Sequence, residues 1–154
     1  MKIIPMQAQH LKMASVLFNE YRMFYDKPSD LEGAELFLQQ RFINKESHVF
    51  LALDEEEMHA MGFVQIYPSF TSVGLGLLYV LNDLYVHPQY RQQGLAQALL
   101  EKTRSAAIEA GALKIILQTA LSNTMAQKLY ESCGYRKEEL FLTYNLSFSS
   151  DLND

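Results

Sequence analysis

Apolar residues recur along this chain with two different spacings, which divide it into helices and strands. Spacings of three and four residues predict helices at residues 7–25, 30–45, 95–110 and 123–134. Short apolar or alternating runs predict strands at residues 2–5, 49–53, 62–67, 77–86, 114–119 and 140–146. This order mixes hairpins with crossovers. It therefore predicts an α/β (α+β) fold: a mixed, mostly antiparallel sheet of about six to seven strands with helices on both faces.

The length and composition fit a single domain over residues 1–146, followed by a polar tail at residues 147–154. With 154 residues, 49% of them hydrophobic, the chain can bury its own core without disulfides or metal. Its one cysteine, Cys133, excludes an internal disulfide and is predicted to be a small buried residue. The start of the sequence does not read as a secretory leader, and the longest apolar run, residues 75–81, is too short to cross a bilayer. We therefore expect a cytoplasmic protein with no membrane partner.

Charge and histidine spacing narrow the function further. The net charge of −5 argues against a nucleic-acid partner, because nucleic-acid binding needs a basic face. The same charge suits a cationic substrate such as an amine. The four histidines are scattered without metal-ligand spacing, so no metal site is predicted.

Residues 90–96 join an apolar strand to an amphipathic helix, and their composition is typical of an anion site. Such a turn aims several main-chain N–H groups at one point, at the positive end of the helix dipole. Gly94 has no Cβ, so a pyrophosphate can approach the main chain, and Ala96 nearly preserves that closeness. Arg91 can donate two hydrogen bonds to phosphate oxygens. The Walker lysine pattern is absent, which argues against nucleotide hydrolysis.

Residues 84–96 resemble the acetyl-CoA-binding motif of the GNAT N-acetyltransferase superfamily, and residues 123–135 resemble that family's second block. The motif has Arg or Gln, two residues, Gly, one residue, then Gly or Ala. The resemblance implies an acyltransferase that uses acetyl-CoA, releases CoA and acetylates a primary amine of a small molecule by direct attack in a ternary complex. Dimers are common among such proteins, so a homodimer is also expected. The implied cofactor-binding residues are Leu84, Tyr85, Val86, Arg91, Gln92, Gln93, Gly94, Leu95, Ala96, Asn123 and Tyr130.

Asn82 and Asp83 interrupt an otherwise apolar strand, where a buried carboxylate is costly unless it is paired. One interpretation is a strand bulge whose side chains are satisfied by neighbouring N–H groups. The other is that both residues line the acceptor pocket, where Asp83 holds the amine or passes its proton to water. Diamine acetyltransferases of the superfamily are similar here but have an acidic pair, so Asn82 puts a polyamine substrate in doubt.

Two tyrosines complete the expected acceptor site, and a third is expected to take part in catalysis. Tyr25 and Tyr67 are predicted substrate contacts, although the aromatic cluster that contains Tyr25 is also typical of simple core. Tyr130 lies seven residues after Asn123, so both fall on one helix face. In the family this tyrosine commonly protonates the departing CoA thiolate, while the asparagine contacts the cofactor. The alternative for Tyr130 is a core tyrosine.

Two other functions stay open. The acceptor could be a protein lysine or N-terminus, or the chain could be a non-catalytic module that binds CoA or a partner. The presence of Asp83 and Tyr130 argues against the non-catalytic module.

Overall fold

The computed structural model describes residues 1–149 and divides the chain into two compact units. The first, Met1–Ala120, contains β1 (Lys2–Pro5), η1 (Ala8–His10), α1 (Leu11–Phe24), α2 (Leu31–Ile43), β2 (His48–Leu53), β3 (Ala60–Thr71), β4 (Gly76–Val86), η2 (Pro88–Tyr90), α3 (Leu95–Glu109) and β5 (Ile115–Leu117). The second begins at Leu121 and contains α4 (Thr124–Ser132). The single domain over residues 1–146 stays a prediction, and the predicted tail lies partly outside the described residues.

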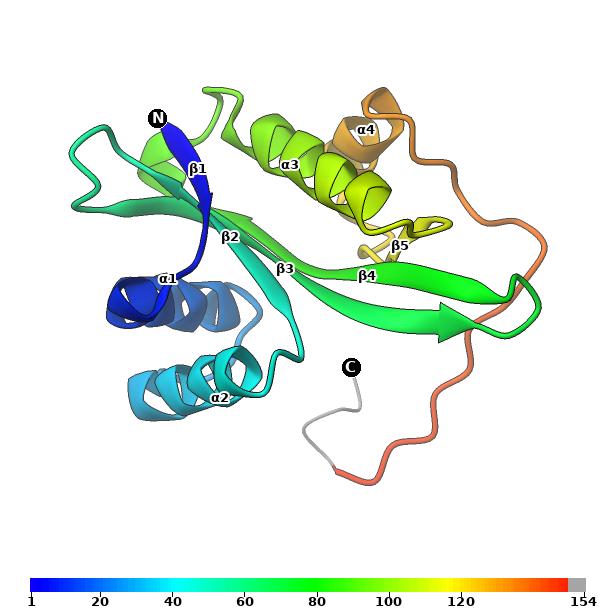
Figure 1. Ribbon diagram of the computed structural model, residues 1–154, viewed down its shortest axis with the longest axis horizontal. Coiled ribbons are helices and arrows are strands. Elements are labelled where there is room, and N and C mark those ends of the chain that lie inside the picture. Colours follow the sequence, from blue (N-terminus) through cyan, green and yellow to red (C-terminus); the bar gives the residue numbers. More distant parts are fainter. Residues whose placement is uncertain (150–154) are drawn as a thin grey trace. The chain divides into compact units, whose positions relative to one another are not determined.

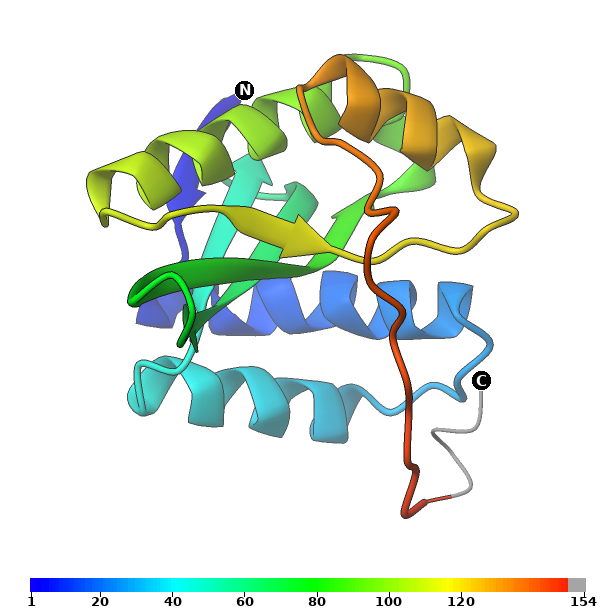
Figure 2. The same ribbon diagram turned by 90° about the vertical axis from the view of Figure 1, so that its right-hand side faces the viewer.

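A mixed five-stranded sheet in the order β1-β2-β3-β4-β5 forms the centre of the first unit (Figure 1). Strands β1 to β4 pair antiparallel with their neighbours, and β5 runs parallel to β4. Helices α1 and α2 lie on one face of the sheet and α3 lies on the other (Figure 2). These observations confirm the predicted fold class and the placement of helices on both faces.

The core between the sheet and α1–α2 is built from the apolar faces that the spacing predicted. Its buried members are Met6, Ala14, Leu17, Phe18, Ala34, Leu38, Val49, Leu51, Leu53, Phe63 and Tyr85. On the other face, α3 comes close to the sheet at Gly62, where a Cβ would lie 2.9 Å from the Tyr85 carbonyl oxygen and 3.3 Å from Leu99 Cδ1. A side chain at position 62 would therefore push α3 away from the strands that carry the site.

Two strand predictions were wrong. Residues 140–146 form no strand within the described chain, so the sheet has five strands instead of about six to seven. Alternation alone does not make a strand, because the main chain also needs a hydrogen-bonding partner. In addition, β3 continues through Pro68 to Thr71, beyond the predicted end of that strand at residue 67. β2 pairs with β3 only as far as Ile66, so Pro68 lies where β3 has become an edge and needs no donor on that side.

Candidate functional site

The turn before α3 presents a row of main-chain donors. Gly94 caps the helix with a φ of 81°, and Gln92 also takes a positive φ, 61°. Within residues 1–149, the N–H groups of Gln92, Gln93, Gly94, Leu95 and Ala96 donate to no protein acceptor. A Cβ built at Gly94 would meet nothing within 4 Å, so the space beside this main chain is open. Free donors, the helix dipole and open space together fit a bound pyrophosphate.

Arg91 connects this turn to the end of β4. Its Nε donates a 2.9 Å hydrogen bond to the carbonyl oxygen of Val86, and its guanidinium lies 5.6 Å from the ring centroids of both Phe24 and Tyr85. Because Nε donates to the main chain, the predicted hydrogen bonds to phosphate must come from the terminal nitrogens of the guanidinium. The side chain meanwhile holds the turn against the strand.

Beyond Leu81, no strand within residues 1–149 pairs with β4 on its β5 side. β5 pairs only with Tyr79, Val80 and Leu81, whereas β4 continues to Val86. The hydrogen bond from the His87 N–H to the Met61 carbonyl oxygen marks where main-chain groups of the β3–β4 pair face each other.

Antiparallel ladders alternate, so the main-chain groups of Leu84 and Val86 must point away from β3, toward this open side. The carbonyl oxygen of Val86 accepts from Arg91 there. The geometry is what the predicted main-chain contact with pantetheine requires.

The side chain of Asp83 points toward α1, where it meets Tyr21. It is 5% exposed, and its carboxylate accepts hydrogen bonds from Gln65 Nε2 at 2.7 Å and Asn82 Nδ2 at 3.0 Å. The Tyr21 side chain also hydrogen-bonds to it. Burial raises the pKa of Asp83, and these three neutral partners lower it in part. No cation of residues 1–149 forms a salt bridge with this carboxylate.

Gln65 is a site residue that sequence reasoning missed. It is completely buried, and its Oε1 accepts a 2.9 Å hydrogen bond from Ser47 Oγ while its amide nitrogen donates to Asp83. With both ends engaged, the amide has one orientation, and Asp83 is always offered a donor. The available signal was a lone polar residue in the apolar strand 62–67, on the strand next to Asp83.

A bulge at Asn82 brings these groups together. Gln65 pairs with Asp83 and Ile66 pairs with Leu81, which leaves Asn82 as the extra residue in β4. The predicted bulge is therefore present. The Asp83 carboxylate accepts from the side-chain N–H groups of its neighbours Gln65 and Asn82, as that interpretation supposed.

The two predicted substrate tyrosines differ in their surroundings. Burial, together with the negative charge of Asp83, raises the pKa of Tyr67 to about 12, so its hydroxyl stays protonated at neutral pH. Tyr25 is 54% exposed and packs its ring edge-on against Tyr21, with 5.1 Å between centroids. Tyr21 in turn bonds to Asp83, so it links Tyr25 to the acidic centre and is a second residue whose role the sequence did not reveal.

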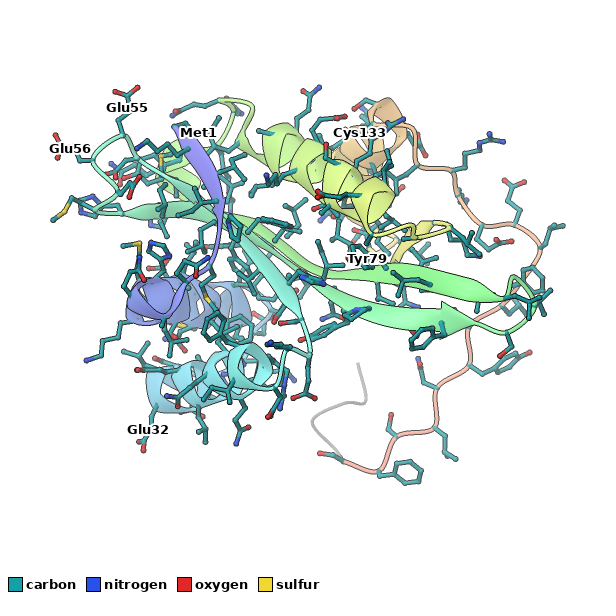
Figure 3. All side chains as sticks on the ribbon, viewed as in Figure 1. Met1, Glu32, Glu55, Glu56, Tyr79 and Cys133 are labelled. Carbon is teal, nitrogen blue, oxygen red and sulfur yellow. The ribbon has the colours of Figure 1, made fainter. Side chains whose placement is uncertain are left out.

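The second unit carries the other predicted site residues. Asn123 caps α4, with its Oδ1 accepting from the Ala126 N–H at 3.1 Å. Tyr130 lies on the same helix, with its ring centroid 5.9 Å from that of Tyr135. Their contacts with cofactor and thiolate stay predictions. Cys133, labelled in Figure 3, is half-buried, which corrects the expectation of a buried residue: it follows a short helix with no fully buried position.

A comparison with protein families identifies the family of this chain. The model of the family described as "Acetyltransferase (GNAT) family" matches residues 14–135. This chain is a GNAT acetyltransferase. It is 44% identical over 131 residues to the "Uncharacterized N-acetyltransferase YhfO" of Bacillus subtilis (strain 168), covering 85% of this chain and 87% of that protein.

Two solved structures have the same fold. A structure described as "Crystal structure of a probable acetyltransferase" has a TM-score of 0.92 and 40% sequence identity, covering 97% of this chain and 99% of that one. The aminoglycoside acetyltransferase AAC(6')-Iy, solved with a bisubstrate analogue of CoA and acetylneamine, has a TM-score of 0.77 and 20% identity, covering 95% and 97%. That second likeness shows the shared fold.

No group of three or more His, Cys, Asp or Glu side chains in residues 1–149 is placed to hold a metal ion. In the same part of the chain, every helix is too short or too polar to cross a membrane.

Proposed function

We propose that this GNAT enzyme transfers the acetyl group of acetyl-CoA to a primary amine of a small molecule, by direct attack in a ternary complex. The observation that carries the proposal is the buried carboxylate of Asp83, which is held by neutral donors only. A buried charge of this kind gains most from a cation, and an alkylammonium group is a cation of the right chemistry.

Several features of the site favour an amine over other acceptors. Hydrogen bonds from Gln65, Asn82 and Tyr21 fix the carboxylate but leave its charge uncompensated. The negative charge of Asp83 helps to raise the pKa of Tyr67, so the Tyr67 hydroxyl keeps its proton and can donate or accept a further hydrogen bond. The net charge of −5 also draws cations toward the protein.

Each reaction step can be assigned to a group of this chain. The bound ammonium must lose a proton before its nitrogen has a lone pair, and Asp83 accepts that proton through water, helped by a pKa that burial raises toward neutral pH. The amine then attacks the thioester carbonyl that acetyl-CoA supplies, and main-chain N–H groups near Val86 stabilise the oxyanion. As the C–S bond breaks, Tyr130 gives a proton to the sulfur, and CoA leaves.

The cofactor would be held along the open edge of β4. Leu84 and Val86 offer their main-chain groups to pantetheine, and the turn from Gln92 to Ala96 offers five N–H groups to the pyrophosphate. Tyr85, Asn123 and Tyr130 complete the set that the family resemblance implies. Residence in the cytoplasm belongs to the same proposal.

A CoA-release assay over defined acceptors tests this function. Polyamines, amino acids and aminoglycosides represent small amines, and lysine peptides and free N-terminal peptides represent protein acceptors. Turnover with a small amine, lost in Asp83→Asn, supports the proposal. Turnover confined to peptides would replace it with protein acetylation. Calorimetric binding of acetyl-CoA without release for any acceptor would make the chain a non-catalytic CoA-binding module.

A further inference from the structure

The last turn of α2 carries a cation that has hydrogen-bond donors available. Arg41 lies in that turn, and its Nε donates a 3.3 Å hydrogen bond to Glu46 Oε1. Its guanidinium lies 4.6 Å from the ring centroid of Phe37, which supports the plane of the group from one side. Within residues 1–149 the Arg41 side chain hydrogen-bonds to Glu46 alone, so its two terminal nitrogens are available to a ligand.

The turn that follows α2 connects this cation to the acidic centre. The Glu46 N–H donates to the Arg41 carbonyl oxygen at 2.9 Å, which fixes the turn against the end of the helix. The next residue, Ser47, donates through Oγ to Gln65, which in turn donates to Asp83. Arg41 and Asp83 therefore lie at the two ends of one series of bonded groups, and all of these residues belong to the first unit.

Tyr67 is close to both charges. It lies two residues beyond Gln65 on β3, so the two side chains point to the same face of the sheet. Burial and then the negative charge of Asp83 raise the pKa of Tyr67, to about 12, and the positive charge of Arg41 lowers it in part. In residues 1–149 the Tyr67 hydroxyl has no hydrogen-bond partner, yet it is not sealed off from solvent, so a ligand can reach it.

We propose that the acceptor is an amino acid: Asp83 holds the ammonium group that is acetylated, and the terminal nitrogens of Arg41 hold the carboxylate. This assignment rests on the proposed acetylation of a small amine and adds the second group of that substrate. A guanidinium binds a carboxylate through two parallel hydrogen bonds, and its charge strengthens both. The Tyr67 hydroxyl, which is near both charges, can donate a further hydrogen bond to the carboxylate.

Charge decides which second group this end of the site accepts. Glu46 already balances one unit of charge at Arg41, so a singly charged carboxylate is favoured over a doubly charged phosphate. A second ammonium group, as in a diamine, would be repelled by Arg41. It could pair only with Glu46, whose side chain is 43% to 49% exposed among the acidic partners of the salt bridges and gains little from an ion pair in water. The site therefore favours a zwitterion.

Acetylation changes how such a substrate is held. The N–C bond forms as the C–S bond of acetyl-CoA breaks. Of the two protons that the nitrogen loses, one goes through water to Asp83 and the other replaces the proton that Tyr130 gives to the sulfur. The product is a neutral amide that keeps its carboxylate, so it has lost the positive charge that Asp83 attracts. With one of its two ionic contacts gone, the product is released more readily than the substrate.

CoA release from matched pairs of acceptors tests the second contact. The pairs are glycine, β-alanine, γ-aminobutyrate and lysine, each beside its carboxamide, which keeps the amine and the carbon chain but removes the negative charge. The series varies the distance between the amine and the carboxylate, so that one member can reach both Asp83 and Arg41. We expect kcat/KM for the best amino acid to exceed that for its carboxamide at least tenfold, because a charge-assisted hydrogen bond is lost in the carboxamide.

Substitutions at the end of α2 show whether Arg41 makes that difference. Arg41→Gln should bring kcat/KM for the amino acid down to that of its carboxamide, chiefly by raising KM, and Arg41→Lys should restore part of it. Glu46→Gln removes a negative charge but keeps an oxygen that accepts from Arg41 Nε, so it should raise kcat/KM for the amino acid. The matched control, Lys45→Gln, removes the same unit of charge from the turn and should keep the preference. Circular dichroism checks that each variant is folded.

The possible failures of this assignment differ from a failure of the proposed function. A carboxamide turned over as well as its amino acid would overturn the assignment, and so would equal losses in Arg41→Gln and Lys45→Gln. A higher kcat/KM for diamines than for any amino acid would place a second ammonium at Glu46 and would also overturn it. In each of these cases CoA is still released with an amine, so acetylation of a small amine stands. No release with any amine would refute the proposed function and this assignment together.

Discussion

Replacing Gln65 by leucine should disable the enzyme selectively at low pH, if Asp83 accepts the proton of the substrate. The variant keeps the size and burial of the side chain but removes the amide that donates to Asp83 Oδ2 at 2.7 Å. That hydrogen bond stabilises the ionised carboxylate more than the protonated one. Its loss therefore shifts Asp83 toward its protonated form, which cannot take a proton from the amine.

The size of the effect follows from the contacts of the carboxylate. A hydrogen bond to a charged group contributes about 1.5–3 kcal/mol. Asn82 and Tyr21 still donate in the variant, so we expect the lower half of that range. Since about 1.4 kcal/mol is a factor of ten, the ionised fraction on the acid side of the profile should fall about tenfold, and kcat/KM with it. On the alkaline plateau Asp83 is ionised in both proteins, and kcat/KM should agree within about threefold.

The assay is CoA release between about pH 5 and pH 9, with a saturating and a limiting concentration of amine. Ser47→Ala is the matched control: it removes the hydrogen bond that orients the Gln65 amide but leaves the donor to Asp83 in place. Its acid limb should move less than that of Gln65→Leu. If the two profiles superimpose on wild type, or if Gln65→Leu loses rate equally at every pH, then Asp83 is not the group whose ionisation controls the reaction.

Three further changes test other parts of the structure. Gly94 and Gly111 lie at opposite ends of α3, have similar positive φ values of 81° and 77°, and have open space around the missing Cβ. In urea unfolding, Gly94→Ala and Gly111→Ala should each lower the free energy of unfolding by about 1 kcal/mol. Calorimetry should show at least tenfold weaker CoA binding for Gly94→Ala only. Tyr130→Phe should lower kcat at neutral pH with CoA affinity nearly unchanged, and Tyr135→Phe on the neighbouring ring should not; an unchanged rate removes Tyr130 from the mechanism. Because burial raises the pKa of Asp83 in the folded state, the folded wild type binds more protons than the unfolded chain, and it loses stability as the pH rises from the ordinary carboxyl range through that raised pKa. The unfolding free energy of Asp83→Asn minus that of wild type should therefore rise over this pH window and then level off. A difference that does not change with pH would contradict the raised pKa.

The cofactor turn could be predicted from the sequence because its physics is local. A glycine that must take a positive φ, a strand before it and an amphipathic helix after it are all visible in residues 77–110. The helix caps Asp30 and Asn123 are equally local, because their side chains accept from main-chain N–H groups three residues later. In these places neighbours in sequence are also neighbours in space.

The acceptor site could be predicted only in part, because it is assembled across strands. Asn82 and Asp83 stood out as polar residues in an apolar run, but their partners come from elsewhere: Gln65 from β3, Ser47 from before β2 and Tyr21 from α1. Only the register of β3 against β4 reveals which polar side chain meets Asp83. The strand prediction for residues 140–146 was wrong because a strand also needs a partner. Their pattern is that of a strand, but no strand of the described chain pairs with them.

The extra residue in β4 makes this strand change phase halfway along. Leu81 pairs with Ile66, and Asp83 pairs with Gln65, so two residues that would share a side in a regular strand point to opposite sides of the sheet. Removing Asn82 would make Leu81 and Asp83 consecutive, and ordinary alternation would then keep Leu81 opposite Ile66 and Asp83 opposite Gln65. The deletion would remove the bulge and the amide that donates to Asp83, but it would leave the carboxylate on the side of α1. Deletion of Asn82 and its replacement by alanine both remove that amide, so the difference between the two variants isolates what the bulge itself contributes to the site.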